Sequence, residues 1–406
     1  MTGRRRIALP AWLRRPGLRM VIRALESAGG TARFVGGAVR AALRREPPGD
    51  IDIATDLVPL RVMAALRRAG LRAIPTGLKH GTVTAVVGGE HVEITTLRVD
   101  VETFGRHARV AFTGNWHADA ARRDLTINAI YAGPDGLVFD TVGGIADLAA
   151  GRVRFVGDAH RRVAEDALRI LRFFRFHARY GRGEPDEAAM AASHDAAALV
   201  GGLSGERISG EMFRILALPD PAPALALMAQ ACVLQYVIPV PFDVDRLQRL
   251  VKLEDIHGLS DPLRRLAALL PRDSAVALSV AGRWRLSNQQ RADLVAFAQA
   301  PPPLDDALAV RRAAYRIGIE RTRAHVLLAA ADGAGGDVAA ALAVLDAWSS
   351  PVLPVRGDDV MALGVTRGPA IGKLLHAVEA WWIDQNFSAS RTESLARLRE
   401  LAKKTV

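Results

Sequence analysis

Two aspartates separated by one residue, Asp50 and Asp52, are the residues of this sequence best suited to metal chemistry. On a β-strand, side chains two positions apart project to the same face, so both carboxylates would converge. Hard oxygen ligands suit Mg²⁺, which takes one or two carboxylates and completes its shell with water and substrate phosphates. Metal ions held in this way can bridge the attacking and leaving oxygens of a phosphoryl displacement. The pair therefore predicts a magnesium-dependent phosphoryl transfer.

The residues before this pair could hold the phosphates. Gly36 and Gly37 end a predicted strand and open a predicted helix, so their backbone N–H groups can meet an anion at a helix N-terminus. Arg40 falls in the first turns of that helix, within reach of the same anion. A Gly-Gly turn or an Asp-x-Asp pair is often structural when it occurs alone. Their order and spacing together favour a phosphate-transfer site.

The predicted secondary structure around these residues changes from mixed strands and helices to helices alone near residue 158. From about 30 to 157, β-branched runs bounded by glycine alternate with short helices, and the runs 81–87 and 91–97 predict an antiparallel hairpin. Beyond that point the strand signal nearly vanishes, and apolar residues at helical spacing alternate with proline-rich segments. The sequence therefore predicts an α+β N-terminal part with a mixed or antiparallel sheet, followed by an all-α C-terminal half.

Composition narrows the class of partner. The 406 residues exceed one ordinary domain, and the balance of 50% hydrophobic and 24% charged residues excludes a largely disordered chain. A net charge of +11 points to an anionic partner, with nucleic acid as the first candidate. No window offers the roughly 20 apolar residues of a membrane span, so no membrane partner is expected. Cys232 is the only cysteine, which excludes an intramolecular disulfide partner and suits a reducing cytoplasmic location.

Six ordered motifs resemble those of the class II nucleotidyltransferase superfamily, the CCA-adding enzymes and bacterial poly(A) polymerases. The resemblance spans residues 34–216, and residues 356–382 also resemble the family's tail segment. The motifs are GG-x-VR with D-x-D-x-x-T (36–55), LKHGTVTAVV…VEITTLR (78–98), ARRDLTINAI (121–130), DTVGGIADLAAGRVRFVGD (140–158), EDALRILRFFRF (165–176) and SGERISGEMFRIL (204–216).

The resemblance implies a division into four parts. Residues 1–150 would form a nucleotidyltransferase head, a palm similar to that of polymerase beta, and residues 151–217 a helical neck that recognises the nucleotide. Residues 218–300 would form a helical body and residues 301–406 a helical tail that binds tRNA. The family's mobile loop falls at residues 100–120, so we expect a mobile loop there.

The resemblance also implies roles for single residues. Glu93 would be a third catalytic carboxylate beside the metal ligands Asp50 and Asp52, Arg123 would contact the phosphates, and Asn128 would lie near the sugar. The family's usual Asp after VR is Ala41 here, and the Pro of its D-P-x-GG is Thr141. The hydrogen bonds of the missing Asp must then come from another group. The implied nucleotide-binding residues are Gly36, Gly37, Arg40, Arg123, Asp124, Asn128, Asp166, Arg169, Arg172 and Arg175.

The segment 165–176 predicts one helix with several charged residues on one face. Alone, this pattern would indicate salt bridges on a solvated surface. The resemblance makes it a base-reading surface, with Asp166 and Arg169 as readers and Arg172 and Arg175 as phosphate contacts or supports. A carboxylate that accepts from an exocyclic amino group, beside a guanidinium that donates to the neighbouring ring atom, would select cytosine and adenine over uracil and guanine.

The function implied by these motifs is template-independent addition of CCA to the 3′ end of tRNA. CTP and ATP would be the nucleotide substrates, Mg²⁺ the cofactor and pyrophosphate the leaving product, while the helical half would hold the tRNA acceptor end. Poly(A) polymerase is the alternative, because the same motifs serve both activities. A non-catalytic RNA-binding protein on the same fold is the other alternative, and the intact Asp50, Asp52 and Glu93 argue against it.

Overall fold

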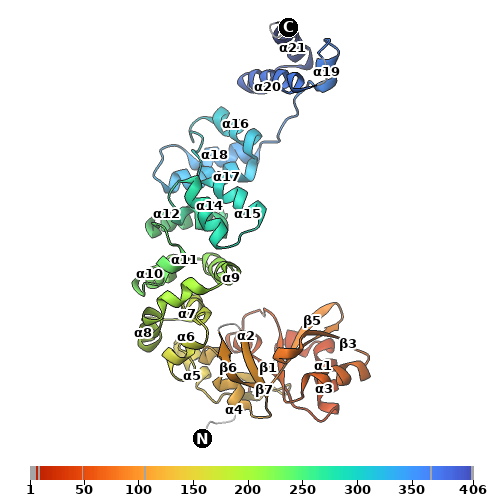
Figure 1. Cartoon of the computed structure of the whole chain (residues 1–406), viewed down its shortest axis with the longest axis vertical. Coiled ribbons are helices and arrows are strands. Elements are labelled where there is room, and N and C mark those ends of the chain that lie inside the picture. Colours follow the sequence, from red (N-terminus) through yellow and green to blue (C-terminus); the bar gives the residue numbers. More distant parts are fainter. Residues whose placement is uncertain (1–5, 8–9, 48, 105–106, 366–367, 404–406) are drawn as a thin grey trace. The chain divides into compact units, whose positions relative to one another are not determined.

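The computed structural model describes residues 6–7, 10–47, 49–104, 107–365 and 368–403 (Figure 1). The chain forms two compact units: residues 1–240 with 283–285, and residues 241–282 with 286–406. The boundary at Val240 falls inside the segment expected to form the body, and the four-part division stays a prediction. Among the described residues, no helix is long and apolar enough to cross a membrane.

The first unit contains a seven-stranded mixed sheet. Only β2 and β5 pair in parallel, and the other neighbouring strands of this sheet pair antiparallel. The predicted hairpin is β4 with β5, so both the hairpin and the mixed sheet are confirmed. In spatial order, the strands are β3 (Arg72–Gly77), β4 (Thr82–Val87), β5 (Glu90–Thr96), β2 (Asp52–Thr55), β1 (Ala32–Val35), β8 (Tyr131–Ala132) and β9 (Val138–Phe139).

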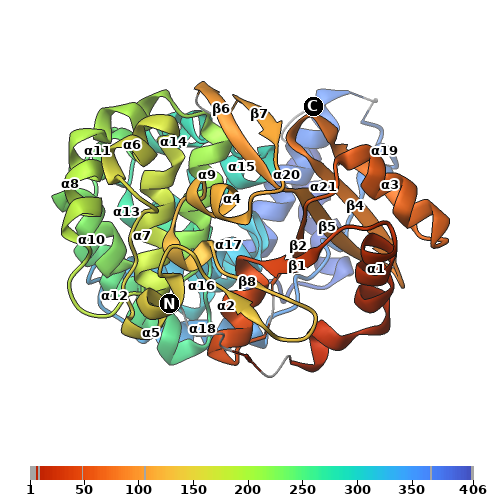
Figure 2. The same ribbon diagram turned by 90° about the horizontal axis from the view of Figure 1, so that it is seen from below.

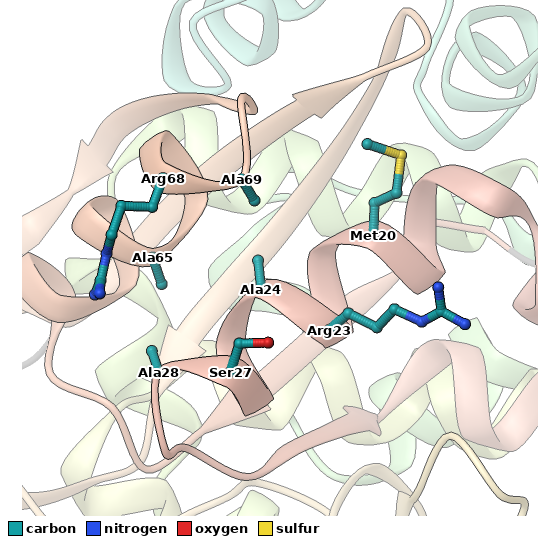
Figure 3. Close-up of a pocket in the computed structure, with 8 residues that line it drawn as sticks. All are labelled: Met20, Arg23, Ala24, Ser27, Ala28, Ala65, Arg68 and Ala69. Carbon is teal, nitrogen blue, oxygen red and sulfur yellow. The ribbon is translucent and has the colours of Figure 1, made fainter.

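Two amphipathic helices, α1 (Pro16–Ser27) and α3 (Pro59–Arg68), pack against each other and against this sheet (Figure 2). Each begins with proline, which is pre-organised for a first helical turn, and α3 ends at Arg68, two positions before Gly70. A hollow between the two helices is lined largely by alanines, with Arg23 and Arg68 beside them (Figure 3). None of the predicted site residues lines this hollow.

The prediction of a loop at residues 100–120 is wrong, while the mobility expected there stays a prediction. The segment forms a separate antiparallel ribbon of β6 (Arg98–Phe104) and β7 (His107–Phe112), followed by α4 (Trp116–Ala121). Valine alternates with charged residues at the start of β6, a period-two pattern that its polar content obscured. Residues 105–106, between the two strands, lie outside the described residues.

The predicted helix over 165–176 is also interrupted. The helix α6 (Ala159–Glu165) ends one residue before Asp166, whose backbone is extended with φ −158° and ψ 108°. The next helix, α7 (Leu168–Tyr180), starts beyond it and ends before Gly181. The break has a local cause, because the Asp166 carboxylate accepts a hydrogen bond from the Leu168 N–H at 3.1 Å. Aspartate stabilises helix starts in this way and favours a new helix over continuation.

The rest of the chain confirms the all-α C-terminal half, since every described element from α10 onward is a helix. The remaining elements of the first unit are η1 (Ala11–Arg14), α2 (Gly37–Arg44), η2 (Leu78–His80), η3 (Thr126–Asn128), α5 (Gly144–Ala150), α8 (Glu187–Asp195), η4 (Ala197–Gly202), α9 (Gly205–Leu216), α10 (Ala222–Gln230) and α11 (Leu234–Val237). Those that follow are α12 (Val244–His257), α13 (Pro262–Leu269), α14 (Ser274–Arg283), α15 (Asn288–Phe297), α16 (Ala307–Ile317), α17 (Ile319–Ala331), α18 (Val338–Asp346), α19 (Gly357–Met361), α20 (Pro369–Asp384) and α21 (Arg391–Lys403).

A close approach at Gly144 fixes the short helix η3, which carries Asn128. A Cβ on Gly144 would overlap the backbone carbonyl of Thr126. We predict that Gly144→Ala destabilises the first unit by roughly 1–3 kcal/mol through overpacking, and thermal unfolding would measure this as a lower Tm. The control is Gly210→Ala in α9, where no atom lies within 4 Å of the added Cβ. Because alanine is the better helix former, the control should keep or raise Tm, and equal losses in both variants would contradict the prediction.

Candidate active site

Three carboxylates approach one another where β2 meets β5. Asp52 opens β2 and is the cross-strand partner of Glu93 in β5. Asp50 lies just before the strand, in a bend, so the strand position predicted for both aspartates holds for Asp52 alone. Burial and the Glu93 carboxylate raise the pKa of Asp52 to about 6; Asp50 adds to the shift and the cation of Arg123 opposes it. The site therefore concentrates negative charge that a bound cation would relieve.

The donor chemistry of this site fits a hard divalent cation. Among the described residues, no group of three or more His, Cys, Asp or Glu side chains could hold a metal ion. Asp50 and Asp52 would then supply two oxygen ligands and leave the other positions to water and substrate phosphates. Mg²⁺ is commonly bound in this way, because it dehydrates reluctantly and favours phosphate oxygens.

The two aspartates line a cleft of about 410 Å³ in the first unit. Most of the other predicted site residues line it too, although they come from the start of α2, the segment from the end of α4 to η3, and α7, which are far apart in the sequence. The predicted residues that line the cleft are Gly36, Gly37, Arg40, Asp50, Asp52, Arg123, Asp124, Asn128, Arg172 and Arg175.

The start of α2 forms one wall of the cleft. Gly36, which precedes the helix, has φ 64° and ψ −116°, a conformation that glycine adopts without the steric conflict of a Cβ. Its N–H donates to the carbonyl of Ile130 at 3.2 Å, which ties this turn to the segment after η3. The first N–H groups of α2 have no partner within the helix, so they are available to an anion in the cleft.

A chain of polar contacts joins three predicted elements of the site. Arg40 of α2 donates to the side-chain oxygen of Asn128, whose amide donates to Asp124 at 3.1 Å. Arg172 of α7 donates to the other oxygen of Asp124 at 2.6 Å. Burial opposes ionisation of Asp124, but the charge and hydrogen bond of Arg172 lower its pKa to about 2. Asp124 is therefore ionised and holds both partners in the cleft wall.

A second buried carboxylate, Glu211 of α9, holds one arginine further along α7 and one arginine of its own helix. Arg175 donates to Glu211 at 2.6 Å, and Arg214 donates to its other oxygen at 2.9 Å. The Glu211 side chain is 4% exposed, so its charge depends on these partners. The aromatic ring of Phe176 lies 4.3 Å from the Arg175 guanidinium and supports it from α7 itself.

Comparison with known proteins shows which families this chain resembles. Residues 32–154 match the family described as "Poly A polymerase head domain", and residues 184–242 match "Probable RNA and SrmB- binding site of polymerase A". CCA tRNA nucleotidyltransferase 1, mitochondrial, of Mus musculus is 34% identical over 91% of this chain and 86% of its own. The CCA-adding enzyme of Lacticaseibacillus paracasei is 32% identical over 88% of this chain and 89% of its own.

The chain belongs to the CCA tRNA nucleotidyltransferase family.

The fold agrees with this assignment. The structure described as "Crystal structure of Bacillus stearothermophilus CCA-adding enzyme in complex with CTP" superposes with a TM-score of 0.77, at 28% identity over 96% of this chain and 99% of the other. The family predicted from the six motifs is confirmed, and so is the fold class of an α+β head followed by helices.

In this CCA tRNA nucleotidyltransferase, the two predicted base readers lie outside the residues that line the cleft. Asp166 accepts from Arg207 at 2.7 Å, and Arg169 donates to Glu165 and to the backbone carbonyl of Arg122. Both side chains are thus held by protein partners. Base reading by Asp166 and Arg169 stays a prediction. It requires that Asp166 still has a free lone pair and Arg169 a free N–H, or that each side chain gives up a protein partner for the base.

Sequence reasoning missed a buried carboxylate behind the cleft, Asp119 of α4. It is 1% exposed, accepts from both Arg122 and Arg123, and receives the Tyr131 hydroxyl at 2.6 Å. Burial raises its pKa, but the two arginines outweigh this effect and lower it to about 2. Asp119 therefore holds Arg123 at the cleft, beside Asp52. The spacing of four residues between Asp119 and Arg123, which is typical of an ion pair at the end of a helix, was the available signal.

We predict that Asp119→Asn lowers kcat/KM for nucleotide addition roughly tenfold or more, because loss of a charge-assisted bond frees the Arg123 guanidinium. The matched control is Arg122→Ala, which removes another partner of Asp119 but no group that lines the cleft. The control should keep most of the activity. Steady-state kinetics with a fixed tRNA would compare them, and equal losses would show that Asp119 acts only on stability.

Proposed function

We propose that this enzyme completes the 3′ end of tRNA with C, C and A by Mg²⁺-dependent transfer at the cleft of Asp50 and Asp52. The observation that carries the proposal is the pairing of β2 with β5, which brings Asp52 and Glu93 together beside an arginine-lined cleft. Carboxylates for a cation and guanidinium groups for phosphates are the two requirements of nucleotidyl transfer. The names of the relatives favour CCA addition over poly(A) synthesis.

In the proposed reaction, the 3′-hydroxyl oxygen of the RNA bonds to the α-phosphorus of CTP or ATP. The bond from that phosphorus to the bridging oxygen of the β-phosphate breaks, and pyrophosphate leaves. Asp50 and Asp52 would hold Mg²⁺, which when bound neutralises phosphate charge and favours deprotonation of the attacking hydroxyl. Glu93 lies beside Asp52 and maintains the negative field of the site.

The arginines of the cleft would bind and align the triphosphate. The structure supports Arg123 in this role, because Asp119 and Tyr131 hold its guanidinium at the cleft. Arg40 and Arg172 are held by Asn128 and Asp124, so their positions are set before the nucleotide arrives. Such preorganisation favours the transition state, since the groups need not reorient as charge develops.

An assay with three tRNAs tests the proposal. The tRNAs end at the discriminator base, at C or at CC, and each is incubated with CTP, with ATP and with both in the presence of Mg²⁺. Stepwise addition of C, C and A followed by a stop is expected, and chelation of Mg²⁺ should abolish it. A long A ladder on unrelated RNA would select poly(A) polymerase instead.

Replacement of either metal-binding carboxylate should separate catalysis from binding. Asp50→Ala and Asp52→Ala should each abolish transfer while tRNA affinity stays near wild type, because phosphate contacts elsewhere carry that affinity. The control, Glu26→Ala, removes an exposed carboxylate from α1 and should keep full activity. Wild-type rates in Asp50→Ala or Asp52→Ala would remove the basis of the metal proposal.

The base-reading proposal has its own test. Asp166→Ala should lose discrimination against UTP and GTP by roughly 5- to 150-fold, which corresponds to ~1–3 kcal/mol per mismatched contact. Arg169→Ala should weaken the use of both CTP and ATP, and Arg172→Ala should raise KM for all four nucleotides alike. The measurement is kcat/KM for each nucleotide on a primer that ends at C. Wild-type ratios in Asp166→Ala would leave Asp166 with the structural role seen at the start of α7.

We also propose that the tail, residues 301–406, binds tRNA and that the enzyme works in a reducing cytoplasm. The single cysteine supports the compartment, although the vertebrate relatives carry mitochondrial names. The net charge of +11 supports the RNA partner.

A further inference from the structure

A second hollow, of about 730 Å³, lies against the catalytic cleft. Glu46 and Pro47, in the loop after α2, line both spaces. The helix α2 itself contributes Ala41 to the cleft and Ala42 to the hollow. The two spaces therefore share a wall, and Asp50 follows this wall closely in the sequence.

The hollow combines an aromatic ring with guanidinium groups. Trp12 lines it from η1, which is anchored by the buried side chain of Leu13. The Trp12 side chain is only partly buried, and it makes no ring contact with another aromatic residue in the described part of the chain. The indole ring therefore contributes partly exposed aromatic surface to the lining of the hollow.

The charge of the hollow is positive. Arg6, Arg14 and Arg45 line it, and the only carboxylate in the lining belongs to Glu46. Glu46 already pairs with Arg44 at 2.5 Å, and Arg6 pairs with Asp135 at 2.8 Å. Within the described residues, Arg14 and Arg45 form no salt bridge, so their charges remain available to an anion.

The backbone of Arg45 adds an independent observation. Arg45 follows α2 with φ 60° and ψ 33°, in the left-handed region. Glycine or asparagine is the usual residue in this conformation at a helix end, because a larger side chain is strained there. Strain of this kind is concentrated at functional sites. Here it accompanies an arginine side chain that lines the hollow.

We propose that this hollow binds one nucleotide of the RNA strand whose 3′ end enters the active site. The base would stack on Trp12, and the phosphate would lie between Arg14 and Arg45. Single-stranded RNA fits this combination, because every base has a stacking face and every linkage carries a negative charge. A volume of this size also suits a nucleotide. The inference rests on the proposed function, since it names a contact to that RNA beyond the cleft.

Direct tRNA binding without nucleotide tests the proposal. Trp12→Ala should raise the tRNA Kd roughly fivefold or more, and Trp12→Phe, which keeps a stacking ring, should restore most of the affinity. Arg14→Ala and Arg45→Asn should each reduce the slope of log Kd against log salt by about 0.7, the value for one contact to a single strand. The control, Arg72→Ala, removes an exposed arginine from β3 of the same unit and should leave the slope nearly unchanged.

The outcomes are distinct from those of the catalytic proposal. If the Trp12 and arginine variants bind tRNA with the affinity and slope of Arg72→Ala, the proposal is wrong. A raised KM for CTP and ATP with unchanged tRNA Kd would assign the hollow to the free triphosphate and also overturn it. Because binding is measured without catalysis, failure of CCA addition in the wild type would contradict the proposed function alone.

Discussion

The contact between Asp124 and Arg172 is the interaction on which the site most depends. The Asp124 side chain is 12% exposed and the Arg172 side chain 31% exposed, so either charge left without the other would lose part of its hydration without compensation. This pair fastens α7 to the segment that follows α4, and Asn128 extends the connection to Arg40 of α2. Glu211 of α9 does the same for the next arginine of α7. The charges that would bind a triphosphate are thus also the charges that join the elements.

The sequence specified the local parts of this arrangement. The glycine turn before α2 and the β4–β5 hairpin follow from short-range rules, and each is found where it was predicted. The cleft brings together ten predicted residues because the motifs, although far apart, belong to one family fold. Composition alone would have supported only a basic, two-part globular protein.

Other features depend on partners that are distant in the sequence. At the helix break, the Asp166 carboxylate accepts from the nearby Leu168 N–H and also from Arg207, forty-one positions later; helical periodicity could not predict this second partner. The role of Asp119 needs Tyr131 as well as two arginines, and only folding brings them together. The absent family aspartate at Ala41 leaves a cleft position without a polar group, while Glu46 lines the same cleft and pairs with Arg44.

The parallel pairing of β2 with β5 has a consequence for how the enzyme is made. The strands are neighbours in space but are separated in the chain by α3, β3, η2 and β4, so the pairing of Asp52 with Glu93 must close this long loop. A shift of one residue in their register would also turn Glu93 to the opposite face of the sheet. A chain with the wrong register therefore lacks the paired carboxylates. Catalytic activity would then require that β2 and β5 have paired correctly.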